Sequence, residues 1–232
     1  MLWSLIDSTG RSETMMGEGD IKHVKVWSGW LRLSHLLIGV SVLLLLITGW
    51  LMANSPVLRD GALDVHYIGM ALLLPGLLIR FWLMGAGREN ERLSGLVPQP
   101  HELQAMWETL RCYLGFGVRP LPNWYAQNPL WKPVYLVIYM GLVIQLLSGV
   151  LVERHPVVLG MSLFTVHELW AGILLWAVLL HIGSVALHDF KNGSADASSM
   201  INGYRLFTVQ QQKPEAGAQF ISVDAIKRSP KN

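Results

Sequence analysis

Two histidines stand 14 residues apart in a strongly apolar stretch of the chain, VHELWAGILLWAVLLHIG. On an α-helix the step from His167 to His181 falls about 40° short of four whole turns, so both side chains leave nearly the same face. They lie roughly 21 Å apart along the helix axis. A neutral imidazole nitrogen is a common metal ligand. The spacing therefore places two potential ligands at two depths of one helix.

Membrane-spanning helices are the elements that must position these residues. Apolar residues make up 52% of the chain and charged residues 15%, and the mean hydropathy is +0.37; a typical soluble domain is about one quarter charged. Segments of about 20 apolar residues can cross the hydrocarbon of a bilayer. Four such segments are present: 31–52, 62–84, 134–152 and 162–187. The sequence predicts an all-α integral membrane protein, a four-helix bundle.

The basic residues give the orientation of the bundle. Arg59 and Arg154 alone lie in the two connections that would face outward. The other sixteen precede the first span or lie at its start, lie at or between the ends of the second and third, or follow the fourth: Arg11, Lys22, Lys25, Arg32, Arg80, Arg88, Arg92, Arg111, Arg119, Lys132, Lys191, Arg205, Lys213, Lys227, Arg228 and Lys231. By the positive-inside rule both termini are cytoplasmic. The excess of basic residues is therefore explained by contact with an anionic membrane surface and does not indicate nucleic-acid binding.

The chain divides into a polar N-terminal segment (1–30), the transmembrane domain (31–187) and a mostly polar cytoplasmic tail (188–232). No signal peptide is expected, because the first 20 residues lack a basic segment followed by a short apolar core. The one long connection, 85–133, contains HELQAMWETLRCYLGF, whose apolar residues recur at three- and four-residue steps. This pattern predicts an amphipathic helix, either lying along the cytoplasmic interface or packed on its own bundle.

The number of cysteines limits the ways in which the chain could hold a cofactor. Cys112 is the single cysteine, which excludes an internal disulfide, a covalent haem attachment through two cysteines and a cysteine-ligated cluster. Phosphate-binding loops, dinucleotide-binding fingerprints and serine-histidine-aspartate arrangements are also missing from the sequence. Any cofactor must be held by other residues, and histidine is the residue type that remains.

Four of the eight histidines lie within the predicted spans, and their depths match in pairs. His66 and His167 lie toward the outer face and are called the outer pair; His35 and His181 lie toward the cytoplasm and are called the inner pair. Ionisable residues inside a membrane are costly and usually mark cofactors or ion paths. Two stacked imidazole pairs suit two haems, each iron held by one histidine from each of two helices.

Other interpretations of these histidines stay open. A single buried histidine is often only hydrogen-bonded to a neighbour, and an ion path would need more carboxylates than Asp64 and Glu168 near the outer ends. Glycines near the four histidines leave room for a flat macrocycle or serve helix packing: Gly39, Gly69, Gly172 and Gly183. The remaining histidines are expected at the surface or in hydrogen bonds: His23, His101, His155 and His188.

The sequence resembles the di-haem cytochrome b subunits that anchor periplasmic nickel-iron hydrogenases, which are related to the gamma subunit of formate dehydrogenase. The similarity runs from about Val26 to Phe207. It rests on RLSH opening the first span, on His66, on the 14-residue spacing from His167 to His181, on QNPLWK before the third span and on SSMINGYR after the fourth.

The resemblance implies a place in a respiratory chain of the bacterial inner (cytoplasmic) membrane. The iron-sulfur small subunit of a hydrogenase, itself bound to the large subunit, would supply electrons, and two b haems would carry them to a quinone; the complex would be a hydrogen:quinone oxidoreductase. Asn128 matches an asparagine of the family's quinone pocket, or else caps the start of the third span. Arg80 and Arg111 would bind a haem propionate or a quinone carbonyl, or lie at the interface without such a role.

Two other functions fit the same sequence. The bundle would also serve another outward-facing dehydrogenase or reductase, acting on formate or thiosulfate. It would also work as a stand-alone quinol cytochrome b, although the long inner connection and the SSMINGYR segment exceed what such a protein needs.

Overall fold

The computed structural model describes residues 20–122, 124–192 and 196–209. Every helix of the described chain lies in one compact unit, His23–Leu206. A second unit comprises residues 1–22 and 207–232, of which 20–22 and 207–209 are described. Most of the predicted polar N-terminal segment and of the predicted tail, residues 1–19 and 210–232, therefore falls outside the described residues.

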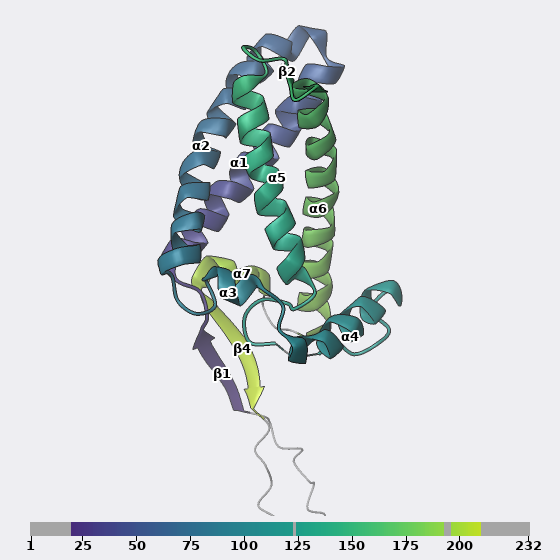
Figure 1. Cartoon of the computed structure of the whole chain (residues 1–232). Helices are drawn as coiled ribbons and strands as arrows, with labels where there is room; N and C mark the ends of the chain where they lie inside the picture. The colour runs from purple at the N-terminus through teal and green to yellow at the C-terminus, as the bar shows by residue number, and fades with distance from the viewer. Residues whose placement is uncertain (1–19, 123, 193–195, 210–232) are drawn as a thin grey trace, which may run out of the picture. The chain divides into compact units, whose positions relative to one another are not determined.

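Four long helices form the bundle, as predicted (Figure 1). They are α1 (Gly29–Asn54), α2 (Arg59–Ala86), α5 (Trp131–Leu151) and α6 (Leu163–Asn192). Each is long and apolar enough to cross a membrane. The helices extend beyond most predicted span ends, α2 beginning at Arg59 and α6 reaching Asn192, because hydropathy marks only the part in hydrocarbon. Backbone hydrogen bonding continues into the polar region on either side.

The helices associate as two close pairs, α1 with α2 and α5 with α6. Glycines allow the close approach. A Cβ atom added to Gly69 would lie 3.1 Å from Leu45, and one added to Gly76 would lie 3.0 Å from Ile38. Small residues at such contacts are the usual device of membrane helix packing. Of the two roles considered for Gly69, room for a macrocycle or helix packing, the structure shows helix packing, because this glycine faces α1.

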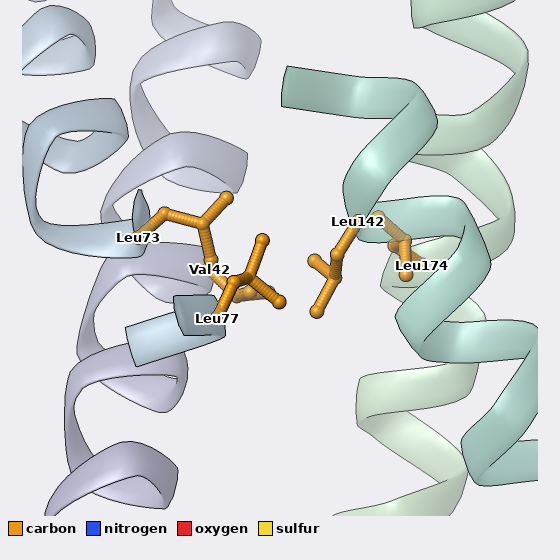
Figure 2. Close-up of a cluster of buried hydrophobic side chains, with 5 residues drawn as sticks. All are labelled: Val42, Leu73, Leu77, Leu142 and Leu174. Atoms are coloured by element: carbon orange, nitrogen blue, oxygen red, sulfur yellow. The ribbon is translucent and has the colours of Figure 1, made fainter. Parts of the chain in front are cut away.

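A layer of aliphatic side chains joins the two helix pairs at mid-depth (Figure 2). It consists of five buried residues from all four helices: Val42, Leu73, Leu77, Leu142 and Leu174. Outside this layer, large apolar side chains such as Trp50 and Trp176 are more than 60% exposed. Lipid tails are as apolar as leucine, so these outer faces need no protein partner in a membrane.

The long connection folds into short helices beside one end of the bundle: α3 (Leu93–Leu96), a 3-10 turn (Pro100–Glu102) and α4 (Leu103–Leu114). The amphipathic segment is helical, as predicted. One face of α4 buries Thr109 and Cys112, whereas Leu103, Trp107 and Leu114 on its other faces are exposed. The helix thus packs on its own bundle and also presents an apolar surface suited to the bilayer interface.

The opposite connections are short. A 3-10 turn (Pro56–Leu58) joins α1 to α2. Between α5 and α6, β2 (Val157–Val158) pairs with β3 (Met161–Ser162) in an antiparallel hairpin. The two turn residues, Leu159 and Gly160, both have positive φ. Such a turn matches the twist of paired strands.

The SSMINGYR segment, which follows α6, forms hydrogen bonds with the residues before α1 and with the connection before α5. It forms α7 (Asp196–Asn202) and begins β4 (Tyr204–Val209), which pairs with β1 (Asp20–Lys25). The Trp27 indole nitrogen donates to Ser199 Oγ at 3.1 Å. The Arg205 guanidinium donates to the carbonyls of residues 124–126 at 3.0–3.2 Å.

A buried carboxylate holds the start of α1 against the connection that follows α2. Glu91 is 1% exposed, and its two oxygens accept hydrogen bonds from the backbone N–H groups of Ser28 (3.1 Å) and Arg88 (3.0 Å). Burial alone would raise the pKa of Glu91, but the hydrogen bonds from Ser28 and Arg88 and the charge of Arg88 outweigh burial and lower it. The ionised form is therefore the one that the fold stabilises.

We expect Glu91→Ala to lower the free energy of unfolding by about 2–4 kcal/mol, because two backbone donors lose their acceptor in a buried site. Since the folded-state pKa is depressed, the stabilisation by Glu91 is complete above the unfolded pKa and is lost as pH falls through the folded pKa. Thermal unfolding in detergent between pH 7 and pH 4 measures both effects. Glu89→Gln, at an exposed neighbour, is the control; an equal loss there would contradict the assignment.

Candidate cofactor site

The structure brings the four span histidines together in two pairs. The ring centres of the inner pair, His35 of α1 and His181 of α6, lie 6.3 Å apart. The ring centres of the outer pair, His66 of α2 and His167 of α6, lie 6.2 Å apart. Each pair joins one helix of the α1–α2 pair to α6. The role of these histidines as metal ligands stays a prediction. The two distances can be compared with the separation that a bound metal ion would require.

Both separations fit one metal ion held between two imidazoles. Two metal–nitrogen bonds of about 2.0 Å, together with about 1.1 Å from each nitrogen to its ring centre, give roughly 6.2 Å between ring centres. Rings in van der Waals contact would stack more closely, and directly hydrogen-bonded rings are not observed in either pair. The donor set is two neutral nitrogens per site, which is the set expected for a b-type haem iron.

Hydroxyl groups fix the outer imidazoles. Thr48 Oγ1 lies 2.8 Å from Nδ1 of His66, and Ser148 Oγ lies 2.9 Å from Nδ1 of His167. Each hydroxyl gives its single proton to a backbone carbonyl of its own helix, that of Leu44 or of Gln145. A hydroxyl so placed can accept the Nδ1 proton of its imidazole, in the tautomer that leaves the Nε2 lone pair for a metal.

Thr48 and Ser148 are site residues that the sequence analysis missed. A glycine follows each of them, and these glycines make room for the imidazoles: a Cβ atom added to Gly49 would lie 3.9 Å from Cε1 of His66, and one added to Gly149 would lie 3.2 Å from Cε1 of His167. The signal in the sequence is the dipeptide of a hydroxyl residue and glycine near the outer end of both partner spans, TG in the first and SG in the third.

Aromatic side chains of α5 border the inner pair. The ring centres of Trp131 and Tyr135 lie 5.6 and 6.2 Å from that of His181, both in edge-on contact. Added Cβ atoms at Gly39, Gly172 and Gly183 would meet no atom within 4 Å. These three of the four glycines near the histidines are therefore not packed against a neighbouring helix, and their role beside a macrocycle stays a prediction.

The aliphatic layer of Figure 2 lies midway between the two histidine pairs. Val42 follows His35 by seven residues and Leu73 follows His66 by seven, and Leu174 stands seven residues from both His167 and His181. Seven residues make about two helical turns, or 10 Å. The two candidate sites are thus separated by one packed apolar layer.

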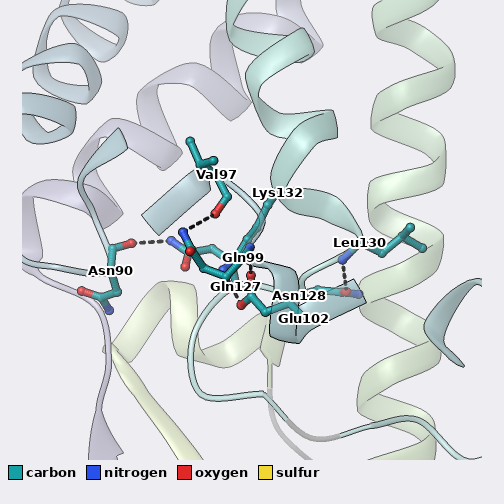
Figure 3. A network of polar contacts seen from close by, with 8 residues as sticks. All are labelled: Asn90, Val97, Gln99, Glu102, Gln127, Asn128, Leu130 and Lys132. Atoms are coloured by element: carbon teal, nitrogen blue, oxygen red, sulfur yellow. Dashed lines mark hydrogen bonds and ion pairs between the residues drawn. The ribbon is translucent and has the colours of Figure 1, made fainter. Parts of the chain in front are cut away.

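Asn128 lies at the start of α5, within a network of polar contacts (Figure 3). Its Oδ1 accepts the N–H of Leu130 at 3.0 Å. This contact closes a turn just before α5; the N-cap residue of the helix is Leu130 and it has no side-chain cap, so Asn128 does not cap α5 as considered from the sequence. The Nδ2 of Asn128 donates to Tyr113 Oη at 3.0 Å. In the same network Lys132 pairs with Glu102 at 2.5 Å. The quinone role of Asn128 stays a prediction.

The two arginines singled out from the sequence differ in environment. Arg80 is 2% exposed; its Nε donates to Tyr139 Oη at 3.0 Å and its Nη1 to the carbonyl of Glu91 at 2.7 Å. Arg111 is exposed and stacks on the Trp107 ring, 4.8 Å from the ring centre. Only Arg80 is buried inside the bundle.

Among the other histidines, His23, His101 and His155 are exposed, as expected. His188 is hydrogen-bonded, as expected, but it is 4% exposed, and Tyr113 and Trp124 cover it.

The fold and the paired imidazoles define a helical membrane protein with two pairs of facing histidines between its spans. Comparison with known families is consistent with this class: residues 26–203 match the family model described as prokaryotic cytochrome b561. The chain belongs to this family, and it is therefore a multi-pass membrane cytochrome of the b type, which binds b-type haem.

One curated relative is a "Probable Ni/Fe-hydrogenase B-type cytochrome subunit" of Cupriavidus necator. The two proteins are 22% identical over 236 aligned positions, which cover 88% of this chain and 96% of the relative. No solved structure matches the chain.

Proposed function

We propose that this protein is the membrane-anchoring di-haem cytochrome b subunit of a nickel-iron hydrogenase and delivers its electrons to a quinone. The observation that carries the proposal is the presence of two imidazole pairs, each at the separation that one iron requires. His66 and His167 would hold the outer haem, and His35 and His181 the inner haem. When bound, the haems supply one-electron transfer across the membrane.

The residues around the pairs have defined tasks in this proposal. Thr48 and Ser148 hold the outer imidazoles in the tautomer that binds iron. Trp131 and Tyr135 shield His181 from water. The Arg80 guanidinium is buried with no carboxylate within 4 Å in the described residues, so it is suited to pair with a propionate of the inner haem.

Two further observations support the proposed partner and orientation. The relative in Cupriavidus necator is named as a hydrogenase subunit, and sixteen of the eighteen basic residues lie on the predicted cytoplasmic side. We place both termini in the cytoplasm of a bacterium and the hydrogenase, bound through its iron-sulfur small subunit, at the outer face of the inner membrane. Asn128, near the inner pair, is the proposed quinone contact. In this arrangement the polar segment 1–30 and the tail 188–232 flank the transmembrane domain 31–187 on the cytoplasmic side.

Haem content and pairing give the first test. The purified chain should hold two low-spin b haems, and acid acetone should release both, because Cys112 alone makes no covalent attachment. His66→Ala and His167→Ala should remove one spectral component, and His35→Ala and His181→Ala the other. A single haem per chain, or loss of the same component from His35→Ala and His66→Ala, would contradict the assignment.

The second test concerns the hydroxyl groups. Thr48→Val and Ser148→Ala should raise the midpoint potential of the outer haem alone and weaken its retention about 10- to 100-fold, because imidazole basicity falls when Nδ1 loses its acceptor. Redox titration of the visible spectrum measures this shift. Ser41→Ala is the matched control, since Ser41 is a buried α1 hydroxyl bonded to the Leu37 carbonyl. Equal shifts in all three variants would refute the specific role.

The third test concerns the partner and the order of electron flow. Purification from membranes in mild detergent should recover a hydrogenase small subunit, and a formate or thiosulfate enzyme in its place would overturn the partner. In the complex, His35→Ala should still allow hydrogen to reduce the outer haem but should abolish quinone reduction. Normal quinone turnover in a complex shown to lack the inner haem would move the quinone site to the outer face.

A further inference from the structure

A hydrogen-bonded cluster lies beside the inner pair, where α4, α6 and the start of α5 meet. Tyr113 Oη lies 2.7 Å from Nε2 of His188, 3.0 Å from Nδ2 of Asn128 and 3.2 Å from Nε1 of Trp131. The Trp131 ring is also in edge-on contact with His181. One tyrosine hydroxyl thus connects the proposed quinone contact to a buried histidine, next to a proposed haem ligand.

The donors and acceptors fix the direction of these hydrogen bonds. The Trp131 indole can only donate, and the Asn128 amide is oriented by the N–H of Leu130, which binds its oxygen. Both therefore donate to Tyr113 Oη and fill its two lone pairs. The hydroxyl proton of Tyr113 then has two acceptors in reach: the Ser184 hydroxyl, which gives its own proton to the His181 carbonyl, and Nε2 of His188 at 2.7 Å. We assign it to Nε2 of His188, which accepts it as a neutral imidazole.

The resting state of the tyrosine agrees with this arrangement. Burial raises the pKa of the Tyr113 hydroxyl, against the hydrogen bonds with Trp131, Ser184 and Asn128, which lower it. The phenol is therefore protonated at neutral pH. Asn128 uses one amide N–H for Tyr113, and its second N–H is the group that would bind a quinone carbonyl.

We propose that Tyr113 and His188 form a proton relay that serves the quinone bound at Asn128. This inference rests on the proposed quinone-reducing function. Reduction of a quinone to a quinol takes two electrons, which the hydrogenase supplies, and two protons, which must come from the cytoplasmic side. A relay beside the inner pair would supply these protons without opening the bundle to water.

Each proton moves in two linked transfers. His188 first takes up a proton from the aqueous side, and its Nε2–H then donates to Tyr113 Oη in place of the Asn128 N–H, while the Tyr113 hydroxyl proton turns from His188 to the quinone. The Tyr113 O–H bond breaks as an O–H bond forms on the reduced quinone oxygen, and Tyr113 Oη takes the Nε2 proton, which leaves His188 neutral again. A second uptake and passage completes the quinol. The residues end as they began, and two electrons and two protons are consumed per quinone.

The competing role for the pair is mechanical, because the same hydrogen bond joins α4 to α6. Tyr113→Phe removes the transferable proton but keeps the ring that stacks on His188, 5.7 Å away between ring centres. His188→Gln keeps an acceptor for the tyrosine hydroxyl but cannot carry a proton between two nitrogens. A relay predicts that both variants slow the reaction, whereas a mechanical joint predicts that His188→Gln behaves as wild type.

The test uses the purified full-length cytochrome, with its haems reduced by dithionite and then mixed with oxidised decylubiquinone or menadione in a stopped-flow instrument. Haem reoxidation in wild type should saturate with quinone. In Tyr113→Phe and His188→Gln the maximal rate should fall about 10²-fold, with an unchanged half-saturating quinone concentration and a larger slowing in D2O. Haem content and spectrum should stay those of wild type. His101→Gln and Tyr204→Phe, at exposed positions, are the matched controls.

The outcomes separate the two proposals. Wild type that is not reoxidised by either quinone would refute the quinone-reducing function itself. Wild-type reoxidation with unchanged maximal rates in Tyr113→Phe and His188→Gln would refute the relay alone. A rate loss that matches a loss of haem, with an unchanged D2O effect, would also refute it and establish the mechanical role.

Discussion

A defined separation of facing imidazoles is combined in this bundle with close contacts inside its helix pairs. Ring centres about 6 Å apart separate α6 from α1 at one depth and from α2 at another, the distance that a bridging iron would hold. Within each close pair the helices approach further: glycines let α2 approach α1, and the Trp170 ring lies only 2.8 Å from where a Cβ of Gly141 would be. Glycine thus allows close contact of the helices inside each pair. The facing histidines lie where α6 and the α1–α2 pair are further apart.

The two helix pairs use the same local solution at their outer ends. In α1 and in α5, a hydroxyl residue followed by glycine faces a histidine of the next long helix, 18 residues further in one case and 19 in the other. The hydroxyl satisfies Nδ1, and the glycine leaves space for the ring beside it. In hydrocarbon, where an unsatisfied polar group is costly, this pairing solves both the hydrogen bonding and the packing of each imidazole. The inner pair is built differently, with aromatic rings of α5 against His181.

The sequence was sufficient for the spans and for the matching of histidines by depth, because both follow from position along a helix axis. It was insufficient wherever the direction around the axis mattered. The choice between the two roles considered for Gly69 needed the structure, in which it faces α1. Thr48 and Ser148 were overlooked because a hydroxyl in a membrane helix ordinarily donates to a carbonyl of its own helix. Only the structure shows that each hydroxyl also contacts Nδ1 of a histidine on another helix. His188 was expected at the surface or in a hydrogen bond; it is hydrogen-bonded to Tyr113, but its burial under α4 could not be predicted, because the path of that connection is set by tertiary contacts.

The aliphatic layer between the histidine pairs has a consequence for energy conversion. A proton crosses a protein along a chain of polar groups or water molecules, and the five side chains Val42, Leu73, Leu77, Leu142 and Leu174 offer neither. An electron can tunnel through such a layer, since tunnelling needs no polar group. The layer would therefore act as a selective insulator, which conducts electrons and blocks protons. Each charge moved across the whole membrane against the potential then stores about 2.3 kcal/mol per 100 mV, and no proton leak beside it dissipates that energy.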